Sequence, residues 1–100
     1  MDQHDALIEA LSGSIVTDSR GVVKHLNRHG QLHRTAGPAV IHPNGTESWY
    51  QHGKRHRVDG PAIVFSNGEC SWFLNGEMLN EREYVHLINT GNYLEPRCLI

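Results

Sequence analysis

The sequence predicts a mainly β (α+β) fold: an antiparallel meander of repeated β-hairpins with a short N-terminal helix and a C-terminal capping helix. Three observations support this fold class. The segment HRTAGPAVIHPNG is followed, 23 residues later, by the closely similar HRVDGPAIVFSNG. Each copy ends in an Asn-Gly pair, which favours a tight hairpin turn. Apolar residues with helical spacing are found near both ends of the chain.

The chain has 100 residues, the size of a single domain, and we expect one domain over residues 1–100. Within it we expect an N-terminal helix (1–13), hairpin repeats (14–79), a C-terminal helix (80–91) and a tail (92–100). Apolar residues make up 38% and charged residues 20%, which is typical of a soluble globular chain and not of a disordered one.

The first expected element is a helix in which Leu7, Ile8 and Leu11 share one face and Gly13 is placed to end it. The segment IVTDSRGVVKHL then has apolar residues on both sides of a Ser-Arg-Gly turn at 19–21. This pattern favours a hairpin, and we interpret it as a degenerate first repeat.

The full repeats are defined by aligning the chain on itself with a shift of 23 residues. A further shift pairs Gly30 with Gly53 and Leu26 with Trp49, so an imperfect copy, with one residue missing around its turn, precedes two full ones. Ten positions are identical between the full copies, and in the first of them these are His33, Arg34, Gly37, Pro38, Ala39, Asn44, Gly45, Ser48, Trp49 and Gly53.

Each repeat is expected to contribute one hairpin. The Gly-Pro pairs at 37–38 and 60–61 are expected to mark strand starts, because glycine adopts backbone shapes that other residues resist and proline cannot donate within a sheet. AVIH and AIVF are the predicted outgoing strands. The two Asn-Gly pairs are predicted to be the central residues of tight turns with positive φ.

The chain then returns through the predicted strands ESWYQ and CSWFL to second turns at 52–53 and 75–76. Trp49 with Trp72, and Tyr50 with Phe73, are expected to stack between successive hairpins on the two faces of the sheet.

A helix is predicted to close the array, because the last hairpin would otherwise leave an apolar face and an unpaired edge. Asn80 is a good N-cap, Glu83 follows three residues later as in a capping box, and Gly91 is placed to end the helix. The expected inner face is formed by Tyr84, Leu87 and Ile88.

The repeat has the form NG-x-x-x-W-[YF]-x-x-G-x-x-HR-x-x-GPA, which resembles the MORN-like hairpin repeats in the divergent type seen in small phage and viral proteins. The resemblance covers roughly residues 20–80, and SWFLNGEMLNEREYVHLI resembles the helical segment that commonly ends such arrays. It implies a binding scaffold. Trp and His-Arg stand where the eukaryotic YxGxxxxGxxxGxG pattern has Tyr and further glycines, so lipid binding is not implied.

Catalytic residues are not predicted, and we expect that the protein is not an enzyme. Ser48, Ser71 and Cys70 lie on predicted strands at positions that the repeat occupies or neighbours. Residues required by a repeat are weak candidates for unique nucleophilic chemistry. The sequence has no nucleophile elbow, phosphate loop or zinc motif, and no cofactor is expected.

Eight histidines raise the question of a metal site. His29 with His33, and His52 with His56, are each four residues apart, but they bracket a turn and a strand start instead of lying on one helix face. No metal site is predicted. We expect His33 and His56 to support the repeat, with each ring hydrogen-bonded to turn backbone near the Gly-Pro of the same or the next hairpin.

The expected location is cytoplasmic, in the bacterial host cytosol if the chain is phage-encoded. The N-terminal segment MDQHDALIEALSG is acidic where a signal peptide would be basic, and no apolar run approaches the roughly 20 residues of a membrane helix. Cys70 and Cys98 are too few for a disulfide framework and are expected to be reduced thiols.

Charge is segregated along the chain, although the net charge is only -2. Residues 20–57 contain seven Lys or Arg residues and one Glu, a balance of 7 - 1 = +6, while residues 1–19 and 58–100 each have a balance of -4. A basic centre fits an acidic protein surface, nucleic-acid phosphates or a solvated face. Because the acidic end of one chain would fit the basic centre of another, a homodimer is also expected.

We expect a non-catalytic binding protein, a small phage or mobile-element protein that binds and blocks a host protein complex, such as one of CRISPR-type defence. The expected partner is an acidic or nucleic-acid-binding host complex, with no membrane involved. The alternative is direct nucleic-acid binding through the basic central repeats. The predicted partner-binding residues are Arg34, Lys54, Arg55, Arg57, Trp49 and Tyr50.

Overall fold

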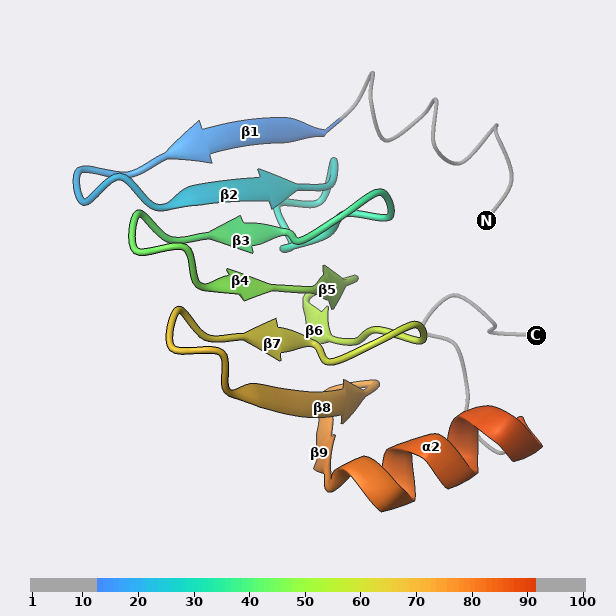
Figure 1. Cartoon of the computed structure of the whole chain (residues 1–100). Helices are drawn as coiled ribbons and strands as arrows, with labels where there is room; N and C mark the ends of the chain where they lie inside the picture. The colour runs from blue at the N-terminus through green and yellow to red at the C-terminus, as the bar shows by residue number, and fades with distance from the viewer. Residues whose placement is uncertain (1–12, 92–100) are drawn as a thin grey trace.

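The computed structural model describes residues 13–91 as an antiparallel β structure closed by one helix (Figure 1). Seven strands form a sheet in the order β1-β2-β3-β4-β7-β8-β9, and β5 and β6 form a two-stranded sheet. This confirms the mainly β fold and the C-terminal helix. The predicted N-terminal helix, the predicted tail and Cys98 lie outside the described residues.

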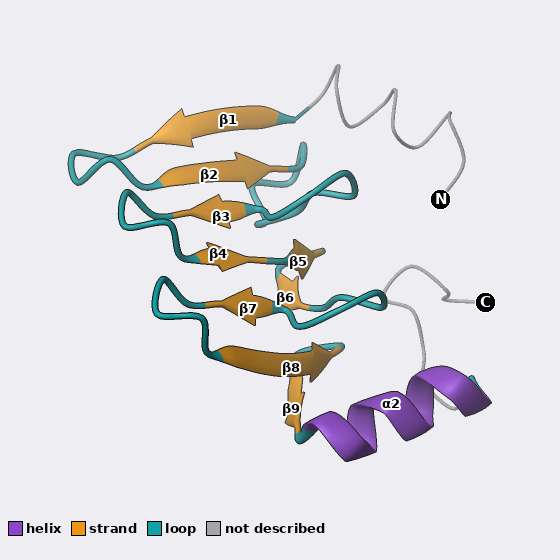
Figure 2. Ribbon diagram, in the orientation of Figure 1, coloured by secondary structure: helices purple, strands orange, loops and turns teal. Residues whose placement is uncertain are grey.

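The strands are short and follow one another through tight turns (Figure 2). Their bounds are β1 Ser14–Thr17, β2 Val23–Leu26, β3 Val40–Ile41, β4 Glu47–Ser48, β5 Tyr50–Gln51, β6 Lys54–Arg55, β7 Ile63–Val64, β8 Cys70–Leu74 and β9 Glu77–Leu79, and helix α2 is Glu81–Thr90. The predicted first hairpin is confirmed, since β1 pairs with β2 across the turn at 19–21.

The β1–β2, β3–β4 and β7–β8 hairpins are closed by three-residue loops, which lie at the same end of the strands of the large sheet. In the β3–β4 loop, Gly45 N–H donates to the His42 carbonyl (2.9 Å), and His42 N–H donates to the Thr46 carbonyl (2.9 Å). Only the glycine of the Asn44-Gly45 pair has positive φ, at 94°. The prediction of an Asn-Gly turn with two positive φ values is therefore wrong, because Asn44 instead uses its side chain to accept the Thr46 N–H (2.9 Å).

The second turn of each copy does have positive φ at both central residues. The values are 51° and 82° at His52 and Gly53, and 54° and 85° at Asn75 and Gly76. This is the two-residue hairpin geometry that matches the twist of a sheet. The prediction of turns at both places is confirmed.

Buried histidines hold these second turns. His33 Nδ1 accepts the His52 N–H (3.0 Å), and His56 Nδ1 accepts the Asn75 N–H (2.9 Å). The predicted bond between each ring and turn backbone is confirmed, but the turn is not the one near Gly-Pro. The imidazole nitrogen satisfies the N–H of the first central residue of each turn, while the N–H of the glycine that follows donates to a neighbouring backbone carbonyl.

The predicted return strand ESWYQ is divided at Trp49 into β4 and β5. Trp49 N–H still donates to the Ala62 carbonyl (2.7 Å), after which the chain leaves the large sheet and β5 pairs with β6. A second set of backbone bonds links residues 32–34 to β5 and its turn, and residues 55–57 to β8 and the turn that follows it. Its bonds are Arg34 N–H to Tyr50 C=O (3.2 Å), Gly53 N–H to Leu32 C=O (2.9 Å), Arg57 N–H to Phe73 C=O (3.4 Å) and Gly76 N–H to Arg55 C=O (2.8 Å).

The alignment of Leu26 with Trp49 is wrong by one residue. His25 N–H donates to the Ala39 carbonyl (2.7 Å), the bond that Trp49 makes with Ala62. The turn that follows β2 is closed by Gly30 N–H bonding to the Asn27 carbonyl (3.0 Å), so its loop has three residues where the turn at 52–53 has two. The first copy therefore has one residue more at this turn, and not one fewer.

The core lies on one face of the large sheet. Register places Val40, Ser48 and Ile63 opposite one another, and all three are buried. Ala62, Ile63 and Phe73 form the buried apolar cluster. The predicted strands AVIH and AIVF are reduced to Val40–Ile41 and Ile63–Val64. With extents of 38 × 37 × 18 Å, the molecule is a thin slab with little interior and much surface.

The glycines of the Gly-Pro pairs do not have positive φ, so the predicted reason for them is wrong. A Cβ at Gly60 would lie 2.9 Å from Arg57 Cζ, and a Cβ at Gly37 would lie 3.2 Å from Arg34 Cζ. The missing side chain makes room for a guanidinium that lies across the glycine. The strands begin after the prolines because Pro38 and Pro61 direct their carbonyls to these guanidinium groups, at 3.1 and 3.0 Å from Nη1.

Gly60→Val is expected to lower the unfolding free energy by about 1–3 kcal/mol, because the added atoms displace the Arg57 side chain. Chemical denaturation of the variant measures this loss. The control is the same substitution combined with Arg57→Ala, where the clash is absent and the added cost of valine should be smaller. An equal cost of valine in both backgrounds would contradict the steric explanation.

Helix α2 begins and ends as the sequence predicts. Asn80 Oδ1 accepts the Glu83 N–H (2.8 Å), and Glu83 Oε1 accepts the Asn80 N–H (3.1 Å), so the capping box is present. Gly91 ends the helix with φ 71°. Tyr84 is buried on the face toward β8, and Leu87 and Ile88 are half-buried beside it. The predicted inner face is confirmed.

Tyr84 joins the helix to the last hairpin. Its ring lies 4.9 Å from the Trp72 ring at 48°. Its hydroxyl donates to the Arg57 carbonyl and accepts the Gly60 N–H (3.2 Å). The tyrosine therefore holds the loop that precedes β7 as well as the end of β8.

Candidate partner-binding surface

A β-ribbon made of β5, β6 and their turn, residues 50–55, has two exposed cations, Lys54 and Arg55, and is called the basic ribbon below. Tyr50 pairs with Arg55 and Gln51 pairs with Lys54. Neighbouring residues of a strand point to opposite faces. Arg55 therefore shares a face with Tyr50, and Lys54 shares the other face with Gln51.

Lys54 is the cation of the ribbon with the fewest structural duties. It is exposed, and its aliphatic stem lies beside Gly76, where a Cβ would be 3.7 Å from Lys54 Cβ. Among residues 13–91, no carboxylate lies within ion-pair distance of its ammonium group. Within the described residues, the fold therefore makes little use of this charge.

Arg55 is exposed but also has a structural role. Its Cζ lies 5.6 Å from the centre of the Tyr50 ring and 5.3 Å from that of the Phe73 ring. A guanidinium over an aromatic face is attracted by the ring quadrupole. The predicted direct stacking of Tyr50 on Phe73 is thus replaced by an arginine bridge between the two rings.

The side chains of Arg57, Arg34 and Trp49 are engaged within the fold. The Arg57 guanidinium lies 3.8 Å from the centre of the Trp49 ring and forms an ion pair with Asp59 (2.8 Å). Arg34 Nη1 donates to the Pro38 carbonyl (3.1 Å), as Arg57 Nη1 donates to the Pro61 carbonyl (3.0 Å). The predicted stacking of Trp49 on Trp72 is not the arrangement found, since Trp49 contacts Arg57 and Trp72 contacts Tyr84.

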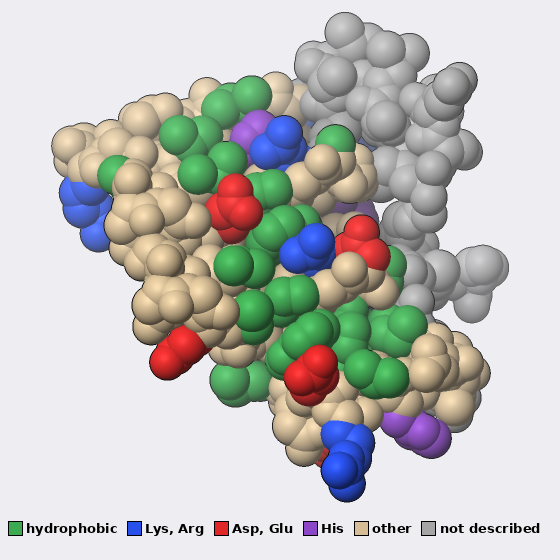
Figure 3. Space-filling view, in the orientation of Figure 1, with side chains coloured by type: hydrophobic (Ala, Val, Ile, Leu, Met, Phe, Trp, Pro, Cys, Tyr) green, Lys and Arg blue, Asp and Glu red, His purple; other side chains and the backbone are tan. Residues whose placement is uncertain are grey.

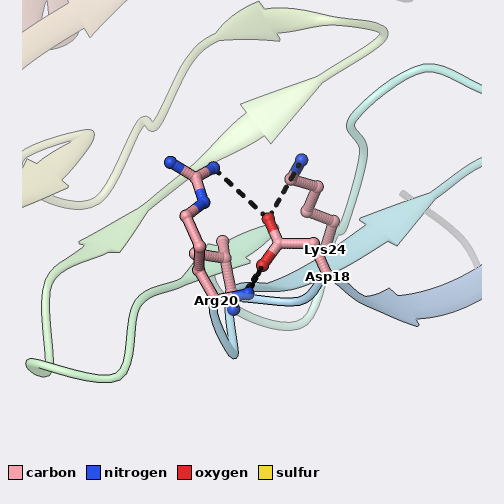
Figure 4. A network of polar contacts seen from close by, with 4 residues as sticks. Asp18, Arg20 and Lys24 are labelled. Carbon is pink, nitrogen blue, oxygen red and sulfur yellow. Dashed lines mark hydrogen bonds and ion pairs between the residues drawn. The ribbon is translucent and has the colours of Figure 1, made fainter.

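Part of the predicted basic centre is neutralised near the first turn. The Asp18 carboxylate lies between Arg20 (3.3 Å) and Lys24 (3.8 Å) (Figure 4). Backbone N–H groups of Val22 and Arg20 also donate to it, at 3.1 and 2.8 Å. These hydrogen bonds, that from Val22 above all, hold the pKa of Asp18 below its usual range.

The pH dependence of stability is expected to include a contribution from Asp18. A carboxyl with a lowered pKa stabilises the fold above its unfolded value near 3.8, and this stabilisation is lost as pH falls through the folded value. Asp18→Asn keeps an acceptor but removes the titration. The unfolding free energy of Asp18→Asn, measured by denaturation between neutral and strongly acid pH, should therefore fall less steeply than that of the wild type; parallel curves would contradict this.

The sheet also presents a face with little charge. Hydrophobic side chains form a band across the middle of the face seen in Figure 3, with single acidic and basic groups between them. By register, Val23, Ile41 and Val64 share the face opposite the core, and all three are half-buried. Within residues 14–79 the exposed Lys and Arg side chains lie on the ribbon, as Lys54 and Arg55, and on the turns before and after β2, as Arg20 and Arg28.

The contacts of four residues described above were not predicted from the sequence. Phe73 under Arg55 was signalled by its repeat equivalence to Tyr50. Asp18 and Asp59 fell in the acidic flanks when charge was summed along the chain, although they lie against basic residues in space. The contacts of Tyr84 with the loop at 57–60 had no signal beyond its place on the inner helix face.

No protein-family model, curated protein or solved structure matches this chain. Within residues 13–91, no helix combines the length and the apolar character needed to cross a membrane. The same residues contain no group of three or more His, Cys, Asp or Glu side chains arranged to hold a metal ion.

Proposed function

We propose that the chain is a non-catalytic binding protein whose contact surface is the basic ribbon. The observation behind this proposal is a contrast among the cations that were predicted to bind a partner. Arg34 and Arg57 are engaged with proline carbonyls, whereas Lys54 is exposed on a two-residue strand with no carboxylate near it among the described residues. A positive charge that the fold does not use is available to a partner.

We further propose that the scaffold is a MORN-like array of 23-residue hairpin units, preceded by an N-terminal helix. Equivalent bonds 23 residues apart support the unit. His33 and His56 each accept the N–H of a turn residue, at 3.0 and 2.9 Å. Ala39 N–H donates to the Ser48 carbonyl (2.8 Å), and Ala62 N–H donates to that of Ser71 (2.9 Å). In such an array Tyr84 packs on the Trp72 ring in the position that Arg57 has over the Trp49 ring of the preceding unit.

The proposed partner is an acidic protein surface, because its negative charges would attract the basic ribbon and speed encounter. A basic surface would be repelled by the ribbon and excluded as a partner. The resemblance to small phage proteins suggests the setting, a bacterial host cytosol in which the chain blocks a host complex. An inhibitor of CRISPR-type defence, bound where the complex would hold nucleic acid, is the specific form of this proposal.

Affinity capture from bacterial lysate tests the proposal, with bound proteins identified by mass spectrometry. A protein partner should be retained after nuclease treatment, lost with Lys54→Glu and kept with Arg82→Glu, a control that reverses an exposed charge on α2. A protein retained equally by wild type and Lys54→Glu would show that the ribbon is not the contact surface.

Direct nucleic-acid binding is a second candidate, favoured by the Tyr50 ring beside Arg55 on one face of the ribbon. Such a site would hold a phosphate at the guanidinium and a base against the ring. Fluorescence anisotropy with a labelled single strand should then show binding that weakens steeply with salt. A captured protein that disappears after nuclease treatment would favour this candidate over the first.

A further inference from the structure

We infer that β1 is a dimerisation edge, at which two copies of the chain join their sheets by antiparallel pairing of β1 with β1. The strand SIVT is exposed at all four positions. Ile15 is 66% exposed and Val16 42%, and among residues 13–91 only β2 pairs with this strand. An uncharged edge strand with three β-branched residues has neither the charged side chains nor the proline that commonly prevent edge pairing.

The backbone of β1 presents donors and acceptors at this edge. Asp18 N–H donates to the Val22 carbonyl (3.1 Å), so Asp18 and Val16 direct their backbone groups to β2. In an antiparallel ladder the alternate residues face the other way. Ile15 and Thr17 therefore direct their N–H and C=O groups outward, where a further strand would bond to them.

Symmetry selects the register. Two antiparallel edge strands are related by a two-fold axis perpendicular to the sheet, so paired residues must share a face and the axis must pass beside one residue. The axis beside Ile15 uses the outward groups of Gly13, Ile15 and Thr17 in both copies. It also places the most exposed apolar side chain of β1 against its own twin.

A second copy fits this edge better than a head-to-tail arrangement. The far edge strand, β9, contains Glu77 and leads into the acidic first turn of α2, with Glu81 and Glu83. Pairing of β1 with β9 would also leave free edges and form open fibres. Pairing of β1 with itself closes the assembly at two chains and displays two basic ribbons.

The pairing involves one short strand, so it buries less than the roughly 800 Å² per partner of a stable interface. We therefore expect a dimer that dissociates on dilution. Because SIVT has no charge, the dissociation constant of this dimer should not depend on salt. This separates edge pairing from a dimer held by the acidic ends and the basic centre, which salt would weaken.

Analytical ultracentrifugation of the full chain over a range of concentrations and at low and high salt tests the inference. Wild type should dimerise equally at both salt levels. Ile15→Lys should weaken dimerisation by at least tenfold, whereas Met78→Lys, at a side chain that is also 66% exposed, should not. A wild type that stays monomeric, a salt-weakened dimer, or an Ile15→Lys variant that dimerises normally would each overturn the inference.

Disulfide trapping tests the register without relying on a charged variant. In a Cys70→Ser and Cys98→Ser background, Ile15→Cys should form a covalent dimer on oxidation. The paired Cα atoms would be about 5.5 Å apart, within the range that a disulfide spans. Met78→Cys in the same background should stay monomeric. Equal cross-linking of the two variants, or none at position 15, would contradict the pairing.

Discussion

His56→Ala is expected to be the most damaging substitution in the repeats, lowering the unfolding free energy by about 3 kcal/mol. His56 is 1% exposed and is the largest fully buried side chain within residues 13–91. Its Nδ1 accepts the N–H of Asn75, which has a positive φ of 54° as the first central residue of the turn at 75–76. Removing the ring leaves a cavity and a buried donor without its acceptor.

Chemical denaturation followed by circular dichroism measures this loss, with His86→Ala as the matched control. His86 is exposed on α2, so its replacement should change stability by no more than about 0.5 kcal/mol. His33→Ala should resemble His56→Ala, because His33 accepts the His52 N–H in the same way. If His56→Ala unfolds at the wild-type denaturant concentration, the imidazole bond does not hold the turn.

Tyr84→Ala is expected to cost about 3 kcal/mol as well, because it removes a buried ring that packs on Trp72 and two hydrogen bonds to the loop at 57–60. Tyr84→Phe keeps the ring and should cost about 1–2 kcal/mol. Thermal unfolding monitored both in the helix signal and by Trp fluorescence measures the two effects.

The two signals also test how the helix acts. If α2 closes the array, Tyr84→Ala should lower the midpoint of both signals together, since β8 loses its cover. A helix signal that melts early while Trp fluorescence is unchanged would show that α2 is an appendage and not part of the cooperative unit.

Much of the fold could be predicted because the signals are local. The capping box of Asn80 and Glu83 and the stop at Gly91 depend on neighbours in sequence, and the structure has all three. The repeated HR-x-x-GPA segment marked the right residues for incomplete reasons. Histidine serves a turn 19 residues away, which is a long-range contact that no local propensity contains. Glycine makes room for the arginine three residues before it, a steric role that glycine's backbone preferences do not indicate.

The division of the return strand at Trp49 could not be predicted for the same reason. No residue between Glu47 and Gln51 marks a break in the strand. The place where the chain leaves the large sheet is shown only by the bond of Trp49 N–H to the Ala62 carbonyl and by the pairing of β5 with β6 that follows.

The candidate site was predictable in part. The predicted turn at 52–53 was correctly placed, and the exposed Lys54 and Arg55 follow it directly. The sequence separates Arg57, which has a counterpart in Arg34, from Arg55, which has none. It does not show the ring contacts of either arginine, because these rings are brought from other strands. Summed charge likewise could not show that Asp18 and Asp59 neutralise their basic neighbours in space.

The affinity of the captured partner for charge-reversed chains tests the central claim most directly. Lys54→Glu combined with Arg55→Glu places two negative charges where the proposal has two positive ones. Isothermal titration should show at least about a hundredfold loss of affinity, or about 1.4 kcal/mol for each reversed charge. Arg82→Glu should bind as the wild type does, and thermal unfolding should show that the double variant stays folded. Undiminished affinity of the folded double variant would contradict a binding role for the basic ribbon.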